Sequence, residues 1–272
     1  MCPLSARLVN GEGSLFARGA MVCHCLLIET GSELILVDTG LGTADIADPR
    51  GRLGGDFVRM TAPRLLREQT ALAHVERLGF QRRDVRHIVP THFDLDHVGG
   101  LSDFPEATVH VFAAEHEAAT RPATFLERRR YRPLQLAHGP RYQAHTAGGE
   151  QWMGFGSIRA IGDEVLLVPL VGHTRGHCGV AVRDGQGWLL HAGDAYFFHG
   201  EMEAKLACPA GLALFQTVIA HDNKQRRRNR ELLRALAQEQ AGSVRVFSAH
   251  DPKELAVAQA MSQAAPAVQG IG

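Results

Sequence analysis

The chain of 272 residues has no excess charge of either sign, since 29 basic residues are balanced by 29 acidic ones. A balanced charge gives no indication of a basic surface for phosphates, so we expect no nucleic-acid partner. No apolar run approaches the ~20 residues that a membrane helix needs, and residues 1–13 lack the apolar segment of a signal peptide. We therefore expect no membrane association and a cytoplasmic location.

Cysteine is also scarce, and its five positions form an odd, scattered set unlike a disulfide framework. We expect reduced thiols. Two cysteines flank His24 within an apolar segment, residues 21–28, that we interpret as a strand. On a strand Cys23 and Cys25 share one face, which favours core packing over metal binding. The others are Cys2, Cys178 and Cys208.

The chain lacks a dinucleotide-binding fingerprint, a repeat period and a low-complexity linker, so we expect one α/β domain over residues 1–272. Hydrophobic residues make up 45% of the chain, enough for a sizeable core. The apolar patterns predict strands at 21–28, 33–37, 85–89, 108–112, 157–161, 165–170, 179–183, 188–191 and 244–247. They predict helices at 63–79, 98–102, 113–119, 223–240 and 253–261.

Metal-ligand side chains follow four of these strands, and the 15 histidines of the chain make this pattern worth testing. The C-terminal ends of strands are where α/β sheets commonly gather their sites. A tight turn that presents residues i, i+2, i+4 and i+5 can surround two cations roughly 3.5–4 Å apart. The residues are His92, Asp94, Asp96 and His97 after the strand 85–89, His173 after 165–170, Asp194 after 188–191 and His250 after 244–247.

The segment 92–97 resembles the His-x-His-x-Asp-His signature of the metallo-β-lactamase superfamily. The turn 37–40, the Gly172-His173-Thr174 element, the Gly193-Asp194 element and His250 follow in the order and spacing of lactonase and glyoxalase-II-like members. The resemblance extends over about residues 20–255. It implies an αβ/βα four-layer sandwich, with two mixed β-sheets packed face to face and helices outside.

The resemblance also implies a role for each matching residue. His92 and His173 would bind one metal ion, and Asp194 would bridge to a second ion. Asp38 would orient the site from behind its ligands, and we favour a structural role for His177. The second ion would be held by Asp96, His97 and His250.

Asp94 departs from the family pattern, which has a second histidine at this position. A carboxylate still binds Zn²⁺ but is a harder ligand, and a glutamate here is typical of flavodiiron proteins. With Asp96, Asp194 and a bridging hydroxide, Asp94 would make a two-metal site neutral and a weaker Lewis acid. We expect two divalent metal ions, zinc foremost, with iron or manganese as alternatives. Otherwise Asp94 lies outside the ligand set and only one ion binds well.

The implied reaction is hydrolysis, in which a metal-bound hydroxide attacks the carbonyl carbon of a lactone or ester. Asp96 and Asp194 would be catalytic, and Tyr196 either donates a hydrogen bond to the substrate or packs on Phe197 and Phe198. His199 is a weaker candidate for the same role. A thioester hydrolase of glyoxalase-II type, a diiron redox protein and a regulator without turnover are the alternatives. We expect a small-molecule substrate, and a homodimer stays open.

Two further features carry alternative interpretations. The arginine runs 128–130 and 226–228 are interpreted as solvated faces, unless one of them meets an anionic group of the substrate. The segment 125–152 is rich in aromatic, leucine and arginine residues. It would be either an amphipathic lid that receives an acyl chain or a helical cap beside the sheet.

Overall fold

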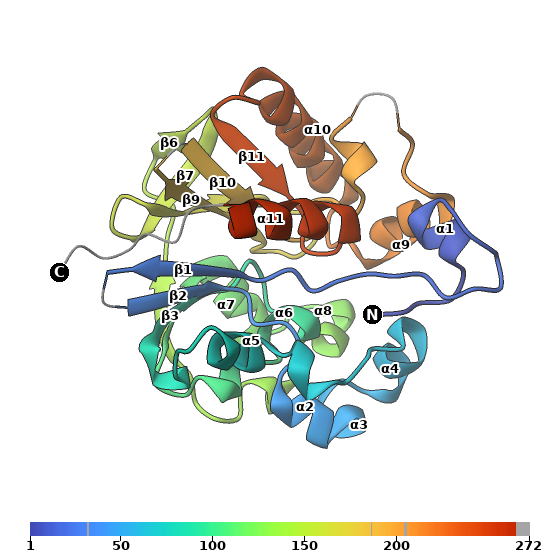
Figure 1. Ribbon diagram of the computed structural model, residues 1–272, viewed down its shortest axis with the longest axis horizontal. Coiled ribbons are helices and arrows are strands. Elements are labelled where there is room, and N and C mark those ends of the chain that lie inside the picture. Colours follow the sequence, from blue (N-terminus) through green and yellow to red (C-terminus); the bar gives the residue numbers. More distant parts are fainter. Residues whose placement is uncertain (32, 186, 204–205, 265–272) are drawn as a thin grey trace.

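The computed structural model describes residues 1–31, 33–185, 187–203 and 206–264 and forms two mixed β-sheets with helices outside them (Figure 1). The first sheet has the order β1-β2-β3-β4-β5, with β1 antiparallel to β2 and the rest parallel. Its strands are β1 (Leu26–Thr30), β2 (Glu33–Val37), β3 (Val85–Val89), β4 (Thr108–Phe112) and β5 (Arg141–His145).

The second sheet has the order β11-β10-β9-β8-β7-β6. The β10–β11 pair is parallel, and the other neighbours are antiparallel. Its strands are β6 (Glu150–Trp152), β7 (Phe155–Ile161), β8 (Val165–Pro169), β9 (Cys178–Asp184), β10 (Gly187–His191) and β11 (Val244–Phe247).

The continuous apolar runs of the central strands arise because both of their faces are buried. Along β2, Leu34 and Leu36 pack into one hydrophobic cluster, whereas Ile35 packs into another, between the sheets. In β8, Leu167 joins the cluster between the sheets, and Leu166 packs on the opposite face. Successive side chains of a strand point to opposite faces, so these strands create three apolar layers between four layers of secondary structure.

The helices close the outer layers. Leu72 and Val75 of α5 pack on the first sheet, and Leu233 and Leu236 of α10 pack on the second. Figure 1 shows α5 to α8 on the side of the first sheet and α10 beside β11. The helices are α1 (Ala6–Asn10), α2 (Thr43–Ala47), α3 (Pro49–Arg52), α4 (Gly55–Thr61), α5 (Ala71–Arg77), α6 (Leu95–Val98), α7 (Ala113–Thr120), α8 (Phe125–Arg130), α9 (Ala210–Ile219), α10 (Asn223–Glu239) and α11 (Pro252–Ala264).

Four local predictions were wrong. The helix expected at 98–102 is absent, since α6 ends at Val98 and a separate 3-10 helix spans Leu101–Asp103. The helix expected over 63–79 is α5 alone, because Thr70 accepts a hydrogen bond from Ala73 N and caps the helix there. The strand expected from residue 21 begins at Leu26, and Cys23 and Cys25 precede it and are partly buried. The segment 125–152 is neither one lid nor one cap, since it contains α8, β5 and β6.

Within the part of the chain that the structure describes, no helix combines the length and apolar character needed to cross a bilayer.

Candidate metal centre

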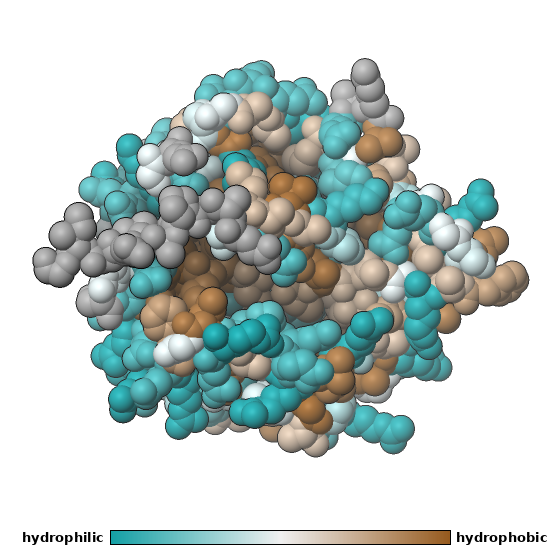
Figure 2. All heavy atoms as spheres, in the orientation of Figure 1, coloured by the Kyte–Doolittle hydropathy of each residue, from teal (hydrophilic) through white to brown (hydrophobic). Residues whose placement is uncertain are grey.

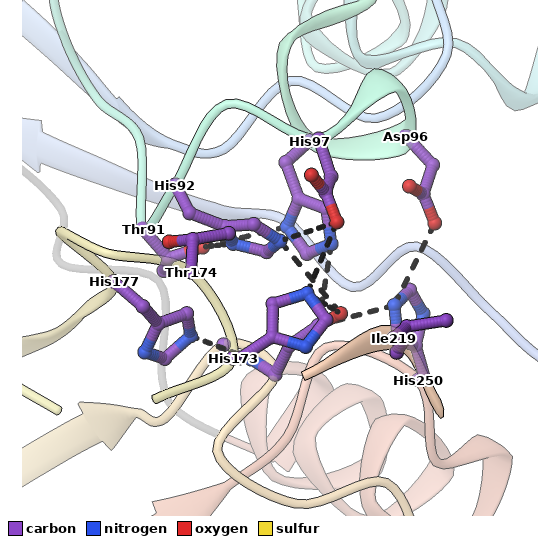
Figure 3. Close-up of polar contacts among 12 residues, drawn as sticks. Thr91, His92, Asp96, His97, His173, Thr174, His177, Ile219 and His250 are labelled. Carbon is purple, nitrogen blue, oxygen red and sulfur yellow. Dashed lines mark hydrogen bonds and ion pairs between the residues drawn. The ribbon is translucent and has the colours of Figure 1, made fainter. Parts of the chain in front are cut away.

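All seven side chains expected as metal ligands converge at one edge of the sandwich. They come from the segments that follow β3, β8, β10 and β11, so four strand ends deliver them as the sequence indicated. Figure 3 shows the rings of His92, His97, His173 and His250 turned toward a common point. The side chains form two groups, His92, Asp94, His173 and Asp194 in one and Asp96, His97 and His250 in the other.

The first group has the spacing of a tetrahedral site. Oδ2 of Asp94 lies 3.4 Å from Nε2 of His92 and 3.0 Å from Nε2 of His173. Oδ2 of Asp194 lies 3.7 Å and 3.3 Å from the same two nitrogens. Four ligands ~2.0–2.1 Å from one zinc ion would lie roughly 3.4 Å apart. These four atoms therefore fit around one cation.

The second group meets the other oxygen of Asp194. Oδ1 of Asp194 lies 3.3 Å from Nε2 of His97 and 3.1 Å from Nε2 of His250. Oδ2 of Asp96 lies 3.6 Å from the His250 nitrogen. Because its two oxygens face different groups, the Asp194 carboxylate has the geometry of a bridge between two cations.

Several of these atoms are buried without a hydrogen-bond partner among the described residues. They include Nε2 of His92, Nε2 of His97 and one oxygen each of Asp94 and Asp194. Buried polar atoms are rarely left unsatisfied, and imidazole nitrogens with carboxylate oxygens are the donor set that zinc, iron and manganese accept. The residues therefore fit a pair of divalent metal ions.

Hydrogen bonds behind the cluster fix which ring nitrogen faces inward. His97 donates from Nδ1 to Oδ2 of Asp38 at 2.8 Å, and Asp38 also accepts from Thr91 N at 2.7 Å. His250 donates from Nδ1 to the carbonyl of Val22 at 2.7 Å. In both rings Nε2 is left as the acceptor directed at the cluster. Asp38 therefore orients a ligand, as expected.

Burial and neighbouring charges shift the pKa values of several side chains in the cluster. Burial would raise the pKa of Asp194, yet the rings of His250 and His97 hold that pKa well below its usual range. Burial would lower the pKa of His97, yet Asp194 and Asp38 raise it well above its usual range. For His173, burial dominates and lowers the pKa to about 4, so this ring is neutral near pH 7, as metal ligation requires.

His177 has the structural role that the sequence favoured. Its Nδ1 donates to the carbonyl of Leu170 at 3.1 Å, and its Nε2 accepts from the backbone N–H of Asp194 at 2.9 Å. The ring fits against Gly193, where an added Cβ would lie 2.6 Å from Nε2. His177 therefore positions Asp194.

Tyr196 does not lie with the cluster, which corrects the expectation that it touches substrate. Its side chain is fully buried, and its hydroxyl donates to Oε1 of Glu254 at 2.8 Å. Burial, with Glu254 beside it, raises the pKa of the phenol well above its usual range. His199 donates from Nδ1 to Asp251 at 2.8 Å. We assign neither residue a contact with substrate.

The expectation that both arginine runs are solvated faces was wrong for one residue of each run, which is largely buried. Nη1 of Arg130 lies 3.2 Å from Oδ2 of Asp94, and Arg130 is the largest influence that opposes burial and keeps the pKa of Asp94 well below its usual range. Arg226 is buried and donates to Oε1 of Gln216 at 2.8 Å. The interpretation as solvated faces holds for the neighbours of these two arginines, which are exposed.

Glu115 of α7 was missed by the sequence analysis. It is buried, and Oε1 accepts from Phe93 N at 2.8 Å and from the Tyr131 hydroxyl at 3.0 Å. Oε2 accepts from the Thr174 hydroxyl at 2.7 Å and from Gly176 N at 3.1 Å. Glu115 thus ties the loop of His92 to the loop of His173. No local pattern indicated this, since the sequence of α7 does not distinguish buried Glu115 from exposed Glu117.

A cavity of about 710 Å³ opens onto the cluster. Asp94, Asp96, Asp194 and His250 belong to its lining, while most of its wall is apolar. The apolar wall includes Phe57, Met60, Phe125, Phe197, Leu212 and Phe215. Figure 2 shows a different, hydrophobic hollow of the surface, between β1 and α11.

Comparison with known proteins agrees with this fold. Residues 18–239 match the family model of the metallo-beta-lactamase superfamily. A probable metallo-hydrolase of Mycobacterium tuberculosis (strain ATCC 25618 / H37Rv) is 43% identical over 244 residues, which cover 88% of this chain and 78% of the relative. The chain therefore belongs to the metallo-beta-lactamase superfamily, and the predicted family and fold are confirmed.

More distant relatives include named lactonases. An N-acyl homoserine lactonase of Azorhizobium caulinodans is 30% identical over 219 residues, covering 80% of this chain and 77% of the relative. A solved structure of an N-acyl homoserine lactone hydrolase, with the product N-hexanoyl-L-homoserine at its metal centre, has a TM-score of 0.66 and 21% identity. It covers 94% of this chain and 92% of that one, and at this identity it shows the shared fold.

Proposed function

We propose that this protein is a metal-dependent hydrolase of carboxylic esters that carry an apolar acyl chain, with lactones as the preferred class. The observation that carries this proposal is the junction of two features, a seven-residue ligand cluster and an apolar cavity that opens onto it. Ligand pockets are typically apolar, with a few polar groups that fix orientation. The lactonases among the relatives support the same substrate class.

We propose two divalent metal ions, zinc foremost, with Asp194 as the shared ligand. His92, Asp94 and His173 would complete the first position, and the second would be held by Asp96, His97 and His250. Bound there, the ions would supply Lewis-acid polarisation of a carbonyl oxygen and a lowered pKa for water.

The protein's own residues would bind and orient the substrate. Phe197, Leu212 and Phe215 line the apolar part of the cavity and would hold the acyl chain while excluding water. The carboxylate of Asp96 is also in the lining. Asp96 would accept the proton released when water adds to the carbonyl carbon, and it would return that proton to the alkoxide that leaves.

A substrate panel tests this proposal. Lactones, linear esters and thioesters of increasing acyl length are assayed with the zinc, manganese and iron forms of the protein. We expect lactones to be hydrolysed and KM to fall as the chain lengthens, because each buried CH₂ contributes about 0.8 kcal/mol. Turnover of thioesters alone would replace the lactonase assignment with a glyoxalase-II-like one, and no turnover of any member would overturn the proposal.

Cavity variants give a second readout. Met60 and Phe125 are more than half exposed and line the cavity, so replacing either by alanine leaves the core intact. We expect Phe125→Ala and Met60→Ala to raise KM for long-chain substrates by about three- to tenfold with little change for short ones. Leu214→Ala is the matched control, since Leu214 is 65% exposed on α9 and does not belong to the lining.

A further inference from the structure

Arg130 is a cation built into the wall of the candidate metal centre. It ends α8, and its side chain is only 10% exposed, whereas Arg128 and Arg129 on the same helix are exposed. Charged residues are almost never buried unless they are paired. The contacts of Arg130 therefore indicate the role of its charge.

Each end of the Arg130 guanidinium is bound. Nη1 lies 3.2 Å from Oδ2 of Asp94 and donates to the carbonyl of His173 at 3.2 Å. Nη2 donates to the carbonyl of Ile219. One side chain thus connects α8 with the loop of Asp94, the loop of His173 and the end of α9. Such a planar fork can bind several acceptors at once.

The two oxygens of the Asp94 carboxylate have different surroundings. Its Oδ2 is shared by Arg130 and the ring of His173, while its Oδ1 is buried with no hydrogen-bond partner among the described residues. A carboxylate adds one negative charge to the first metal position, where a histidine would add none. The guanidinium beside it adds one positive charge.

We propose that Asp94 and Arg130 act as one neutral unit that takes the place of an uncharged ligand at the first metal position. The inference rests on the proposed metal centre. Arg130 is then a positioning residue, which acts on the metal ion through Asp94. The net charge of the pocket equals that of a site with a neutral histidine at position 94 and no arginine beside it. The two residues are exchangeable together but not one at a time.

The zinc affinities of the two single variants and of the double variant test this balance of charge. Zinc is titrated into metal-stripped native protein, Asp94→His, Arg130→Gln and the double variant, in competition with a chromophoric chelator. We expect Asp94→His to weaken the first zinc position about tenfold, because an unpaired guanidinium then faces the dication. The double variant should bind within about threefold of native protein, since the excess charge is gone.

Internal controls separate charge from packing. The second zinc position, held by Asp96, His97 and His250, should keep its affinity in all four proteins. Arg129→Gln, which removes an exposed arginine of the same helix, should leave both positions unchanged. In the Asp94→His background, adding Arg130→Lys should leave the zinc affinity of the first position as low as it is with arginine, because lysine keeps the positive charge. Relief by lysine equal to that by glutamine would overturn the proposal.

The outcome also distinguishes this inference from the proposed function. If native protein binds no zinc, the metal centre itself is wrong. If zinc binds but the double variant is as weak as Asp94→His, the metal centre stands and the neutral unit is wrong. Should Asp94→His not fold by circular dichroism, the native background decides. There Arg130→Lys should keep the native affinity, and Arg130→Gln should tighten the first position about tenfold.

Discussion

The ring of His177 holds the backbone of Asp194 through a 2.9 Å hydrogen bond from the Asp194 N–H to Nε2. The opposite nitrogen donates to Leu170, so the ring cannot turn without losing both contacts. A buried residue outside the cavity lining thereby controls the position of the Asp194 carboxylate.

Replacing His177 by alanine should leave the Asp194 N–H buried and unpaired and open a small cavity beside it. We expect a loss of about 2–4 kcal/mol in the free energy of unfolding and a lower zinc content after dialysis. Urea unfolding and elemental analysis measure the two effects. His177→Gln keeps an acceptor oxygen and should lose less of both. Native zinc content in His177→Ala would contradict the positioning role.

Replacing Glu115 by glutamine should destabilise the protein without altering its surface. All four hydrogen bonds to Glu115 come from donors, so an amide NH₂ must face two of them in either orientation. An unsatisfied buried group costs about 1–3 kcal/mol, which thermal unfolding would detect. Glu117→Gln on the same helix is the control, because Glu117 is exposed. Equal melting temperatures for the two variants would refute the linking role of Glu115.

A row of histidines crosses β3, β4 and β5. Because of this row, we expect the free energy of unfolding to fall as the pH is lowered. Nε2 of His110 lies 2.9 Å from His87, whose other nitrogen faces Glu33, and Nδ1 of His110 lies 3.1 Å from His145. Burial, followed by the two neighbouring rings, lowers the pKa of His110 to about 4. The unfolded chain therefore takes up a proton below about pH 6.5, whereas the folded protein resists protonation down to about pH 4.

This row predicts a measurable difference between variants. Between pH 7 and pH 5, His110 alone should remove about 2 kcal/mol from the free energy of unfolding, and the loss should level off below the folded pKa. His110→Gln has no proton to take up, so its stability should decline less over that interval. The free energy of unfolding is measured by urea denaturation for native and variant protein at both pH values. An equal loss in the two proteins would show that His110 is not the source.

The convergence of the candidate ligand side chains could be predicted from the sequence because each of them follows a strand marked by an apolar run. His173 after β8 is an example, since Leu166 and Leu167 fill two different core layers. The start of α5 was also open to prediction, because Thr70 is a favourable N-cap residue. The longer helical pattern obscured that signal.

Arg130 and Glu115 could not be assigned in the same way. The importance of each depends on partners that only the tertiary structure brings near, such as Gly176, which is 61 residues from Glu115. In the sequence, Arg130 is one of three consecutive arginines, and the two exposed ones fit the common pattern of a solvated face. Burial of a single member of a charged run leaves no periodic trace.

The central claim is that two metal ions share Asp194 and that hydrolysis depends on them. The most direct measurement is a zinc titration of metal-stripped protein with hydrolysis of a long-chain acyl lactone as the readout, run in parallel on Asp194→Ala. We expect native activity to rise until two equivalents are bound and Asp194→Ala to be at least about a hundredfold slower, because the bridge is lost. Full activity in stripped protein, or equal lactone hydrolysis by native protein and Asp194→Ala, would contradict the account.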